Sequence, residues 1–275
     1  MNIAPTVTTI KSYNIKTLIR YRKEPLILSF IQLSLTLILI GVAAGIVSTV
    51  GGLASLVSYP ALLALGLPPV TANVTNTAGL IFTGVGASLA SRKELKHQKR
   101  ELITLLPLTL IGCIVGALLL FKIPAETFQK IVPFFILSAG ILILLPRHLQ
   151  VGQPAKWQVS LAWLGVFLVG IYSGYFGAAS GVLMLSLLSV ISQAPFQEYN
   201  ATKNLTMGLA NCIATLVYAL QTTINWGLVL PLGIGFLIGG LIGPIIVRLL
   251  PERLTKIGIG IAALGLAVSL FMQAY

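Results

Sequence analysis

Small and polar residues interrupt an otherwise apolar sequence at two places, and these residues have the chemistry to bind a ligand. The first place runs from Ser48 through Gly51 and Gly52 to the polar stretch 71–77, and the second covers 173–180 and 200–211. In lipid such groups are costly unless they are buried in protein or line a cavity. We therefore expect each place to form part of a substrate site. The candidate substrate-binding residues are Ser48, Gly51, Gly52, Asn73, Thr75, Asn76, Thr77, Ser173, Gly177, Ser180, Thr202, Lys203, Asn204 and Asn211.

The polar stretch 71–77 has the groups that bind an anion. Asn73, Asn76 and Thr77 are separated by three and four residues, so on a helix they share one face. Because 71–77 opens the helix predicted over 71–90, its free backbone N–H groups and the helix dipole also favour negative charge. Glycines nearby let the backbone approach a ligand. The alternative is that Thr and Asn cap the helix and Gly packs it.

Lys203 is the one basic residue inside such a polar cluster. If the preceding segment ends at membrane depth, the ammonium needs an anion or several carbonyl groups as partners. A transported anion is one such partner. The alternative is a lysine at a helix end that extends to the membrane surface, close to Glu198.

The composition indicates a polytopic membrane protein. Apolar residues make up 56% of the chain and charged residues 9%, against about 25% charged in a soluble domain. The length allows roughly eight to ten spans. The net charge of +12 lies beside the apolar segments, as in loops near an anionic membrane, which argues against nucleic-acid binding.

The acidic residues and histidines exclude several functions. The chain has no Asp, and its six Glu and two His all lie in loops or at the ends of apolar segments. This distribution argues against an enzyme, a metal centre or a bound cofactor, and against a carboxylate proton relay. Cys113 and Cys212 lie in apolar runs and are expected to be buried thiols.

The chain divides into a basic tail, 1–25, and two membrane repeats, 26–150 and 151–275. Equivalent residues recur 124 to 129 positions apart, as in Gly45 with Gly170 and Gly52 with Gly177; this spacing also pairs Val74 with Lys203. The predicted apolar segments are 26–50, 53–66, 71–90, 102–121 and 128–146, followed by 157–175, 178–193, 201–221, 226–249 and 255–273.

The second segment of each repeat is too short to cross a membrane as a straight helix. Segment 53–66 would extend roughly 21 Å, less than the ~30 Å hydrocarbon core. We expect 53–66 and 178–193 to be broken or re-entrant helices, the alternative being short tilted spans. The Lys and Arg bias between equivalent loops favours inverted repeats of five crossings; eight spans in parallel repeats is the alternative.

Glycine motifs and tryptophans have packing roles in this prediction. Gly112-x-x-x-Gly116, Gly235-x-x-x-Gly239 and Gly239-x-x-x-Gly243 are expected to let helices approach closely. Trp157, Trp163 and Trp226 are expected to anchor the chain at the membrane interface.

The chain resembles the TauE/SafE (sulfite exporter type) family of membrane permeases from about residue 30 onward. The matching features are Gly45-x-x-Ser48-x-x-Gly51-Gly52, Pro60-x-Leu62, Gly66-Leu67-Pro68-Pro69-x-x-Ala72-Asn73-Val74-Thr75-Asn76, Gly174-x-x-Gly177, Ala201-Thr202-Lys203, Asn211, Ile224-Asn225-Trp226, Gly239-Gly240-x-x-Gly243 and Leu250-Pro251. The chain departs from the family at Gly51–Ser55 and at Gly177–Gly181, where longer glycine runs or a Gly-Pro-Gly-like turn are common. The resemblance implies export of sulfite, a sulfonate or a related sulfur anion across a bacterial-type plasma membrane.

These observations predict a multi-pass secondary transporter of a small anion that works by alternating access. The anion is expected between the two polar clusters. The coupling ion is left open between H⁺ and Na⁺. The alternatives are a small-anion channel and a membrane component that serves a partner complex without transport.

Overall fold

The protein is helical throughout the part that the structure describes. The computed structural model describes residues 26–122 and 156–274, and the isolated helical positions Phe134, Leu137, Ile141 and Leu144. The tail 1–25 and most of the predicted segment 128–146 lie outside the described residues. The helices are α2 (Leu26–Gly51), α3 (Ser55–Ala64), α4 (Pro69–Ala90), α5 (Arg92–Leu95), α6 (Lys99–Leu119), α8 (Lys156–Tyr175), α9 (Ser180–Ile191), α10 (Phe196–Gln221), α11 (Trp226–Leu249) and α12 (Glu252–Ala274).

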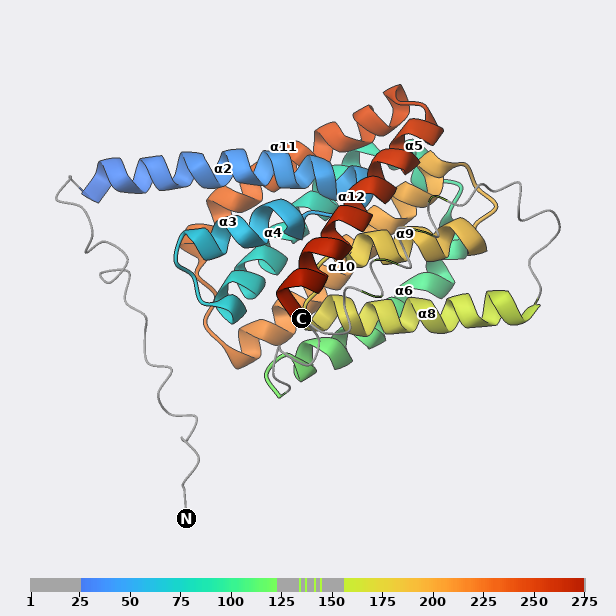
Figure 1. Cartoon of the computed structure of the whole chain (residues 1–275), viewed down its shortest axis with the longest axis horizontal. Helices are drawn as coiled ribbons and strands as arrows, with labels where there is room; N and C mark the ends of the chain where they lie inside the picture. Colours follow the sequence, from blue (N-terminus) through green and yellow to red (C-terminus); the bar gives the residue numbers. More distant parts are fainter. Residues whose placement is uncertain are drawn as a thin grey trace, which may run out of the picture.

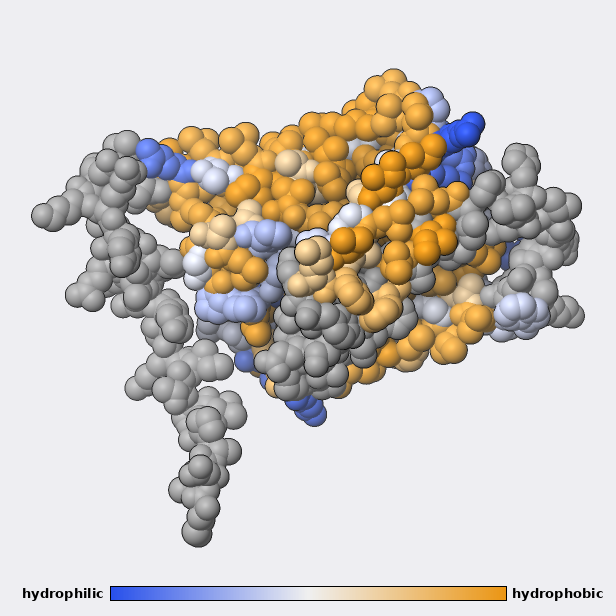
Figure 2. All heavy atoms as spheres, in the orientation of Figure 1, coloured by the Kyte–Doolittle hydropathy of each residue, from blue (hydrophilic) through white to orange (hydrophobic). Residues whose placement is uncertain are grey.

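The chain is an integral membrane protein. Among the described residues, three stretches are long and apolar enough to cross a bilayer: Phe30–Gly51, Lys99–Leu119 and Trp226–Leu249. Apolar side chains cover most of the visible surface over α2 and α11 (Figure 2). Helix α4 has 22 residues and is long enough to span, but it carries the polar residues of the first cluster and is therefore less apolar.

Helices from the first half of the chain pack against helices from the second half. Helix α2 from the first half packs along α11 from the second, and α8 packs along α6 (Figure 1). Helices α4 and α10 pack on each other at the centre, and each also packs on one of these outer pairs. In Figure 1, α2 and α8 run in opposite directions, the arrangement that inverted repeats require. The inverted topology itself, and the division at residue 150, remain predictions.

Glycines allow the helices of both outer pairs, α2 with α11 and α6 with α8, to pack with their backbones close together. A Cβ on Gly235 or Gly239 would meet the backbone of α2, and one on Gly112 or Gly116 would meet the backbone of α8. A Cβ on Gly243 would meet the Thr49 side chain. The predicted packing role of these glycine motifs is therefore confirmed.

The two central helices cross at a pair of glycines. Gly84 of α4 and Gly208 of α10 face each other, and a Cβ on either would strike the other's Cα. The crossing therefore fixes how closely the two polar clusters approach.

A short helix follows a sharp break in each half. Gly52 and Gly177 have φ of 76° and 70°, a backbone region that favours glycine, and they end the first helix of each half. The following helices α3 and α9 have 10 and 12 residues, or about 15 and 18 Å. Neither is long enough to cross a bilayer, so the prediction of short helices at 53–66 and 178–193 is confirmed; whether they re-enter the membrane stays a prediction.

Trp157 and Trp226 are exposed at helix starts, as expected of interface anchors. Trp163 packs partly buried against the main apolar cluster, and its interface role stays a prediction.

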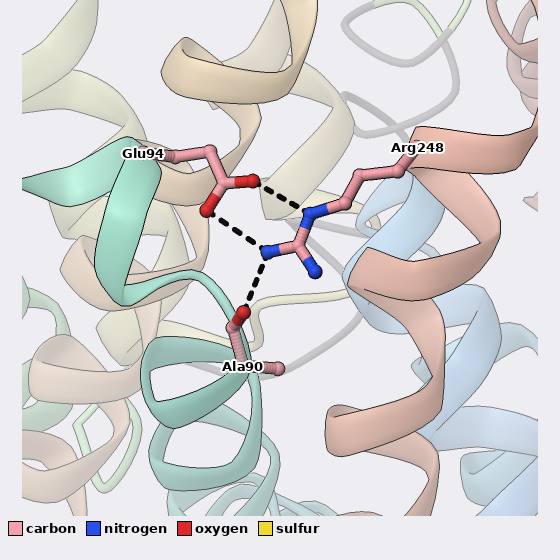
Figure 3. Close-up of polar contacts among 3 residues, drawn as sticks. All are labelled: Ala90, Glu94 and Arg248. Atoms are coloured by element: carbon pink, nitrogen blue, oxygen red, sulfur yellow. Dashed lines mark hydrogen bonds and ion pairs between the residues drawn. The ribbon is translucent and has the colours of Figure 1, made fainter.

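An ion pair links the short helix α5, just after α4, to the end of α11. Arg248 donates from Nε to Glu94 Oε1 at 2.7 Å and from Nη2 to Glu94 Oε2 at 2.9 Å (Figure 3). Arg248 Nη2 also donates to the Ala90 carbonyl at 2.6 Å. The Arg248 guanidinium holds the pKa of the Glu94 carboxyl below its usual range.

We expect this ion pair to weaken in acid. A lowered folded-state pKa stabilises the protein fully above the unfolded value of about 4.3, and this contribution is lost as the pH falls through the lowered folded-state pKa. At pH 7, Glu94→Gln should lower the free energy of unfolding by about 0.5–1 kcal/mol, since the pair is partly exposed. Thermal denaturation should show a smaller difference between wild type and variant at pH 3.5 than at pH 7. An equal difference at both pH values would contradict the ion-pair explanation.

Candidate functional site

A polar cavity lies between α4 and α10, beside the breaks that follow α2 and α8. Its volume is about 40 Å³, room for roughly three water molecules. It is lined by Ser48, Gly52, Ala54, Ser55, Asn76, Thr77, Leu80, Thr83, Gly84, Ser173, Phe176, Gly177, Ser180, Gly181, Lys203, Asn204, Met207, Gly208 and Asn211.

The side chain of Lys203, from α10, is buried against the C-terminal end of α2. It is 1% exposed, and its Nζ donates to the Ser48 carbonyl at 3.0 Å and the Thr49 carbonyl at 3.3 Å. Ser48 keeps its helical hydrogen bond from the Gly52 N–H at 2.7 Å, whereas Thr49 lies in the last turn before the break at Gly52. Both carbonyls carry the negative end of the helix dipole. The alternative that Lys203 extends to the surface beside Glu198 is therefore wrong, and Glu198 instead accepts from Gln98 at 2.5 Å.

Three side chains of α10 converge on one carbonyl group. Asn200 and Asn204 donate from Nδ2 to the Thr49 carbonyl at 3.0 and 3.2 Å, beside the Lys203 ammonium. A carbonyl oxygen has two lone pairs and an ammonium has three donors. The three side chains therefore compete for the Thr49 carbonyl, and some of their N–H groups remain available to a ligand in the cavity.

The first half has an equivalent arrangement at the end of α8. Asn73 donates from Nδ2 to the Tyr175 carbonyl at 3.3 Å, just as Asn200 donates to Thr49. Pro68 precedes α4 and Pro195 precedes α10, and both asparagines lie five residues after these prolines.

Counting from the same prolines places Asn76 at the position of Lys203. The sequence comparison paired Val74 with Lys203, two residues away from this correspondence. Val74 instead packs in an apolar cluster with Cys113 and Tyr218. By this count, the residue of the first half that corresponds to Lys203 is the amide Asn76, and not the aliphatic Val74.

Asn76 is held in a fixed orientation by two serines of α3. Ser58 Oγ donates to Asn76 Oδ1 at 2.6 Å, and Asn76 Nδ2 donates to Ser55 Oγ at 3.2 Å. The side chain is 2% exposed. An amide nitrogen has two donors, so one N–H of Asn76 remains for a ligand in the cavity.

Thr83 adds an unused hydroxyl group to the cavity lining. Its side chain is 4% exposed, and its Oγ1 has no hydrogen-bond partner among the described residues. An unsatisfied buried polar group costs about 1–3 kcal/mol, a cost that a bound ligand or water would remove. Thr83 was not predicted from the sequence, although it lies seven residues after Asn76 and therefore on the same face of α4.

The structure brings most of the candidate residues to this one cavity. Those that line it are Ser48, Gly52, Asn76, Thr77, Ser173, Gly177, Ser180, Lys203, Asn204 and Asn211. Four candidates do not. Gly51 faces Ile259, Asn73 binds the end of α8, Thr75 is buried elsewhere, and Thr202 donates to the Glu198 carbonyl at 3.2 Å. Ser55, a weaker candidate from the sequence, also lines the cavity, and the residues that were not anticipated are Ala54, Leu80, Thr83, Gly84, Phe176, Gly181, Met207 and Gly208.

The charge of the cavity has one sign. Lys203 is the only Lys, Arg, His or carboxylate side chain among the described residues that line it. Glu101, half-buried near the start of α6, instead accepts from Ser192 Oγ at 2.9 Å. Within the described chain, no three His, Cys or carboxylate side chains group together as metal ligands do. What the cavity offers a ligand is hydrogen-bond donors and one positive charge.

Comparisons with known proteins agree with the resemblance in the sequence. The family model described as "Sulfite exporter TauE/SafE" matches residues 37–272. A probable membrane transporter protein of Haemophilus influenzae is 29% identical over 157 residues, which covers 56% of this chain and 61% of that protein. Probable membrane transporter protein ORF9 of Sinorhizobium sp. is 24% identical over 82% of this chain and 88% of its own length. YfcA of Escherichia coli K12, also a probable membrane transporter protein, is 23% identical over 80% and 82%. No solved structure matches the chain.

Proposed function

The chain belongs to the sulfite exporter TauE/SafE family, and from this premise we propose that it is a secondary transporter of a small anion. The observation that supports this function most directly is the cavity with one buried cation and no carboxylate among its described lining residues. A cationic substrate would meet Lys203 without a counter-charge, whereas an anion would offset the cost of burying the ammonium.

The anion would lie between Lys203 on α10 and Asn76 on α4. The ammonium supplies a charge-assisted hydrogen bond, the stronger kind, and Asn76 supplies its free N–H. Thr83 lies further along the same face of α4 and supplies its unused hydroxyl. The cavity of about 40 Å³ suits an anion of a few heavy atoms, such as sulfite or a small sulfonate.

Three side-chain links join the two halves of the protein near one end. They join the segment 94–101 of the first half to the second half: Glu94 with Arg248 at 2.7 Å, Gln98 with Glu198 at 2.5 Å, and Glu101 with Ser192 at 2.9 Å. Alternating access would require these links to break when the cavity opens to that end. The coupling ion, H⁺ or Na⁺, remains part of the proposal.

Anion flux into proteoliposomes tests this function. Purified protein should carry radiolabelled sulfite with saturable kinetics, and external unlabelled sulfite should exchange with labelled sulfite inside. Choline of the same concentration should neither move nor compete. Single-channel currents with sulfite would instead identify an anion channel, and a complete lack of anion flux under H⁺ and Na⁺ gradients would overturn the proposal.

Asn76→Ala should weaken anion binding about tenfold. The change removes one amide hydrogen bond to the anion and releases the two serines of α3, an effect of about 1.5 kcal/mol. The measurement is the half-saturating sulfite concentration in the same flux assay. Thr75→Ala is the matched control, because Thr75 is buried one residue away and does not line the cavity. Equal effects from both substitutions would contradict a role for Asn76 in the site.

A further inference from the structure

A second hollow lies at the far end of α4, away from the central cavity. It has a volume of about 390 Å³ and is lined by Leu89, Ala90, Arg92, Lys93 and Arg248. Three of these residues are cations and two are apolar. Because Glu94 binds Arg248, the hollow and its nearest carboxylate together hold three positive charges and one negative, a net charge of +2.

Arg248 retains a free part of its guanidinium in this hollow. Its Nε and Nη2 are used by Glu94 and the Ala90 carbonyl. Figure 3 shows the remaining nitrogen directed away from both partners. That Nη1 carries two donors, which no hydrogen bond to a described residue uses.

The hollow lies at the boundary between apolar and polar surface. Close to it in the sequence of the two helices, Val85 and Leu89 of α4 and Ile245 and Leu249 of α11 are large apolar residues with 44–77% of their surface exposed. In Figure 2, hydrophilic residues gather at the right-hand end of the molecule, beside the broad apolar surface over α11. A ligand here would have cations around its head and apolar side chains along its tail.

We propose that this hollow binds the phosphate group of an anionic phospholipid, with the acyl chains along the exposed apolar residues of α4 and α11. Arg92, Lys93 and the Nη1 of Arg248 would hold the phosphate oxygens, a geometry that Arg suits well. The Lys and Arg bias of this loop predicts the cytoplasmic side, where anionic lipid collects. This lipid site is separate from the transport cavity and does not depend on its substrate.

Lipid binding to two charge-matched double variants tests the site. The full chain in detergent is titrated with phosphatidylglycerol or phosphatidylcholine, and bound lipid is counted by native mass spectrometry. Arg92→Gln with Lys93→Gln should weaken phosphatidylglycerol binding about 30-fold, since each basic residue contributes roughly a factor of five. Lys99→Gln with Arg100→Gln removes the same charge from exposed positions outside the hollow and should change binding less than about threefold.

Three outcomes would overturn the proposal. Equal losses in both double variants would mean that the lipid responds to the overall surface charge. Equal retention of phosphatidylcholine and phosphatidylglycerol would remove the role of the negative charge. Competition by soluble glycerophosphate at the same concentration as the lipid would show that the hollow binds free phosphate esters without the membrane.

Discussion

Lys203→Met should lower anion flux at least 100-fold while the protein remains folded. The ammonium is the only positive charge among the described residues that line the cavity, and a charge-assisted hydrogen bond in a site shielded from water has no substitute in a thioether. A 100-fold loss corresponds to about 2.7 kcal/mol, in the range for a hydrogen bond to a charged group. Met keeps a similar length, so the change is mainly one of charge.

Stability and transport should separate in this variant. The Lys203 ammonium stabilises the end of α2 through the Ser48 and Thr49 carbonyls, but burying it is costly, so its removal is expected to change the free energy of unfolding by less than about 2 kcal/mol. The thermal midpoint in detergent checks folding, and sulfite flux checks function. Thr202→Val is the matched control, because Thr202 is the preceding residue of α10 and lies outside the cavity. Flux equal to wild type in Lys203→Met would remove Lys203 from the site.

The positions of the helices could be predicted from the sequence because the apolar runs are long and end at Gly or Pro. The segments expected at 26–50, 157–175 and 226–249 are helices at Leu26–Gly51, Lys156–Tyr175 and Trp226–Leu249. Polar helix starts were predicted less well. Helix α10 begins at Phe196, five residues before the apolar segment expected at 201, because its first turns are buried by neighbouring helices despite their polarity.

The partners of the polar residues could not be predicted, because they come from packing between the halves. Nothing in the spacing of α10 indicates that Lys203 meets the carbonyl groups at the end of α2, 155 residues earlier in the chain. Counting from the prolines that precede α4 and α10 would have paired Asn76 with Lys203. Sequence similarity alone favoured Val74, because the local match of Ala72 with Ala201 outweighed the helix starts.

Gly84→Val should destabilise the protein more than any other single substitution considered for the central helices. A Cβ on Gly84 would strike the Cα of Gly208, and backbone cannot move aside as a flexible side chain can. Overpacking of a core costs about 1–3 kcal/mol, and we expect the upper end or more because α4 and α10 must separate. The thermal midpoint should fall by roughly 10 °C, and flux should be lost with it, since the same crossing positions Asn76 opposite Lys203.

Gly258→Val is the matched control for this substitution. Gly258 lies in α12, and a Cβ there would meet no atom within 4 Å, so the same change of residue should leave the thermal midpoint within about 2 °C of wild type. Gly84→Ala adds a single methyl group and should fall between the two, since the first carbon already makes the contact with Gly208. If Gly84→Val were as stable as Gly258→Val, α4 and α10 would not be in backbone contact, and the cavity between them would have a different shape from the one on which the anion site is based.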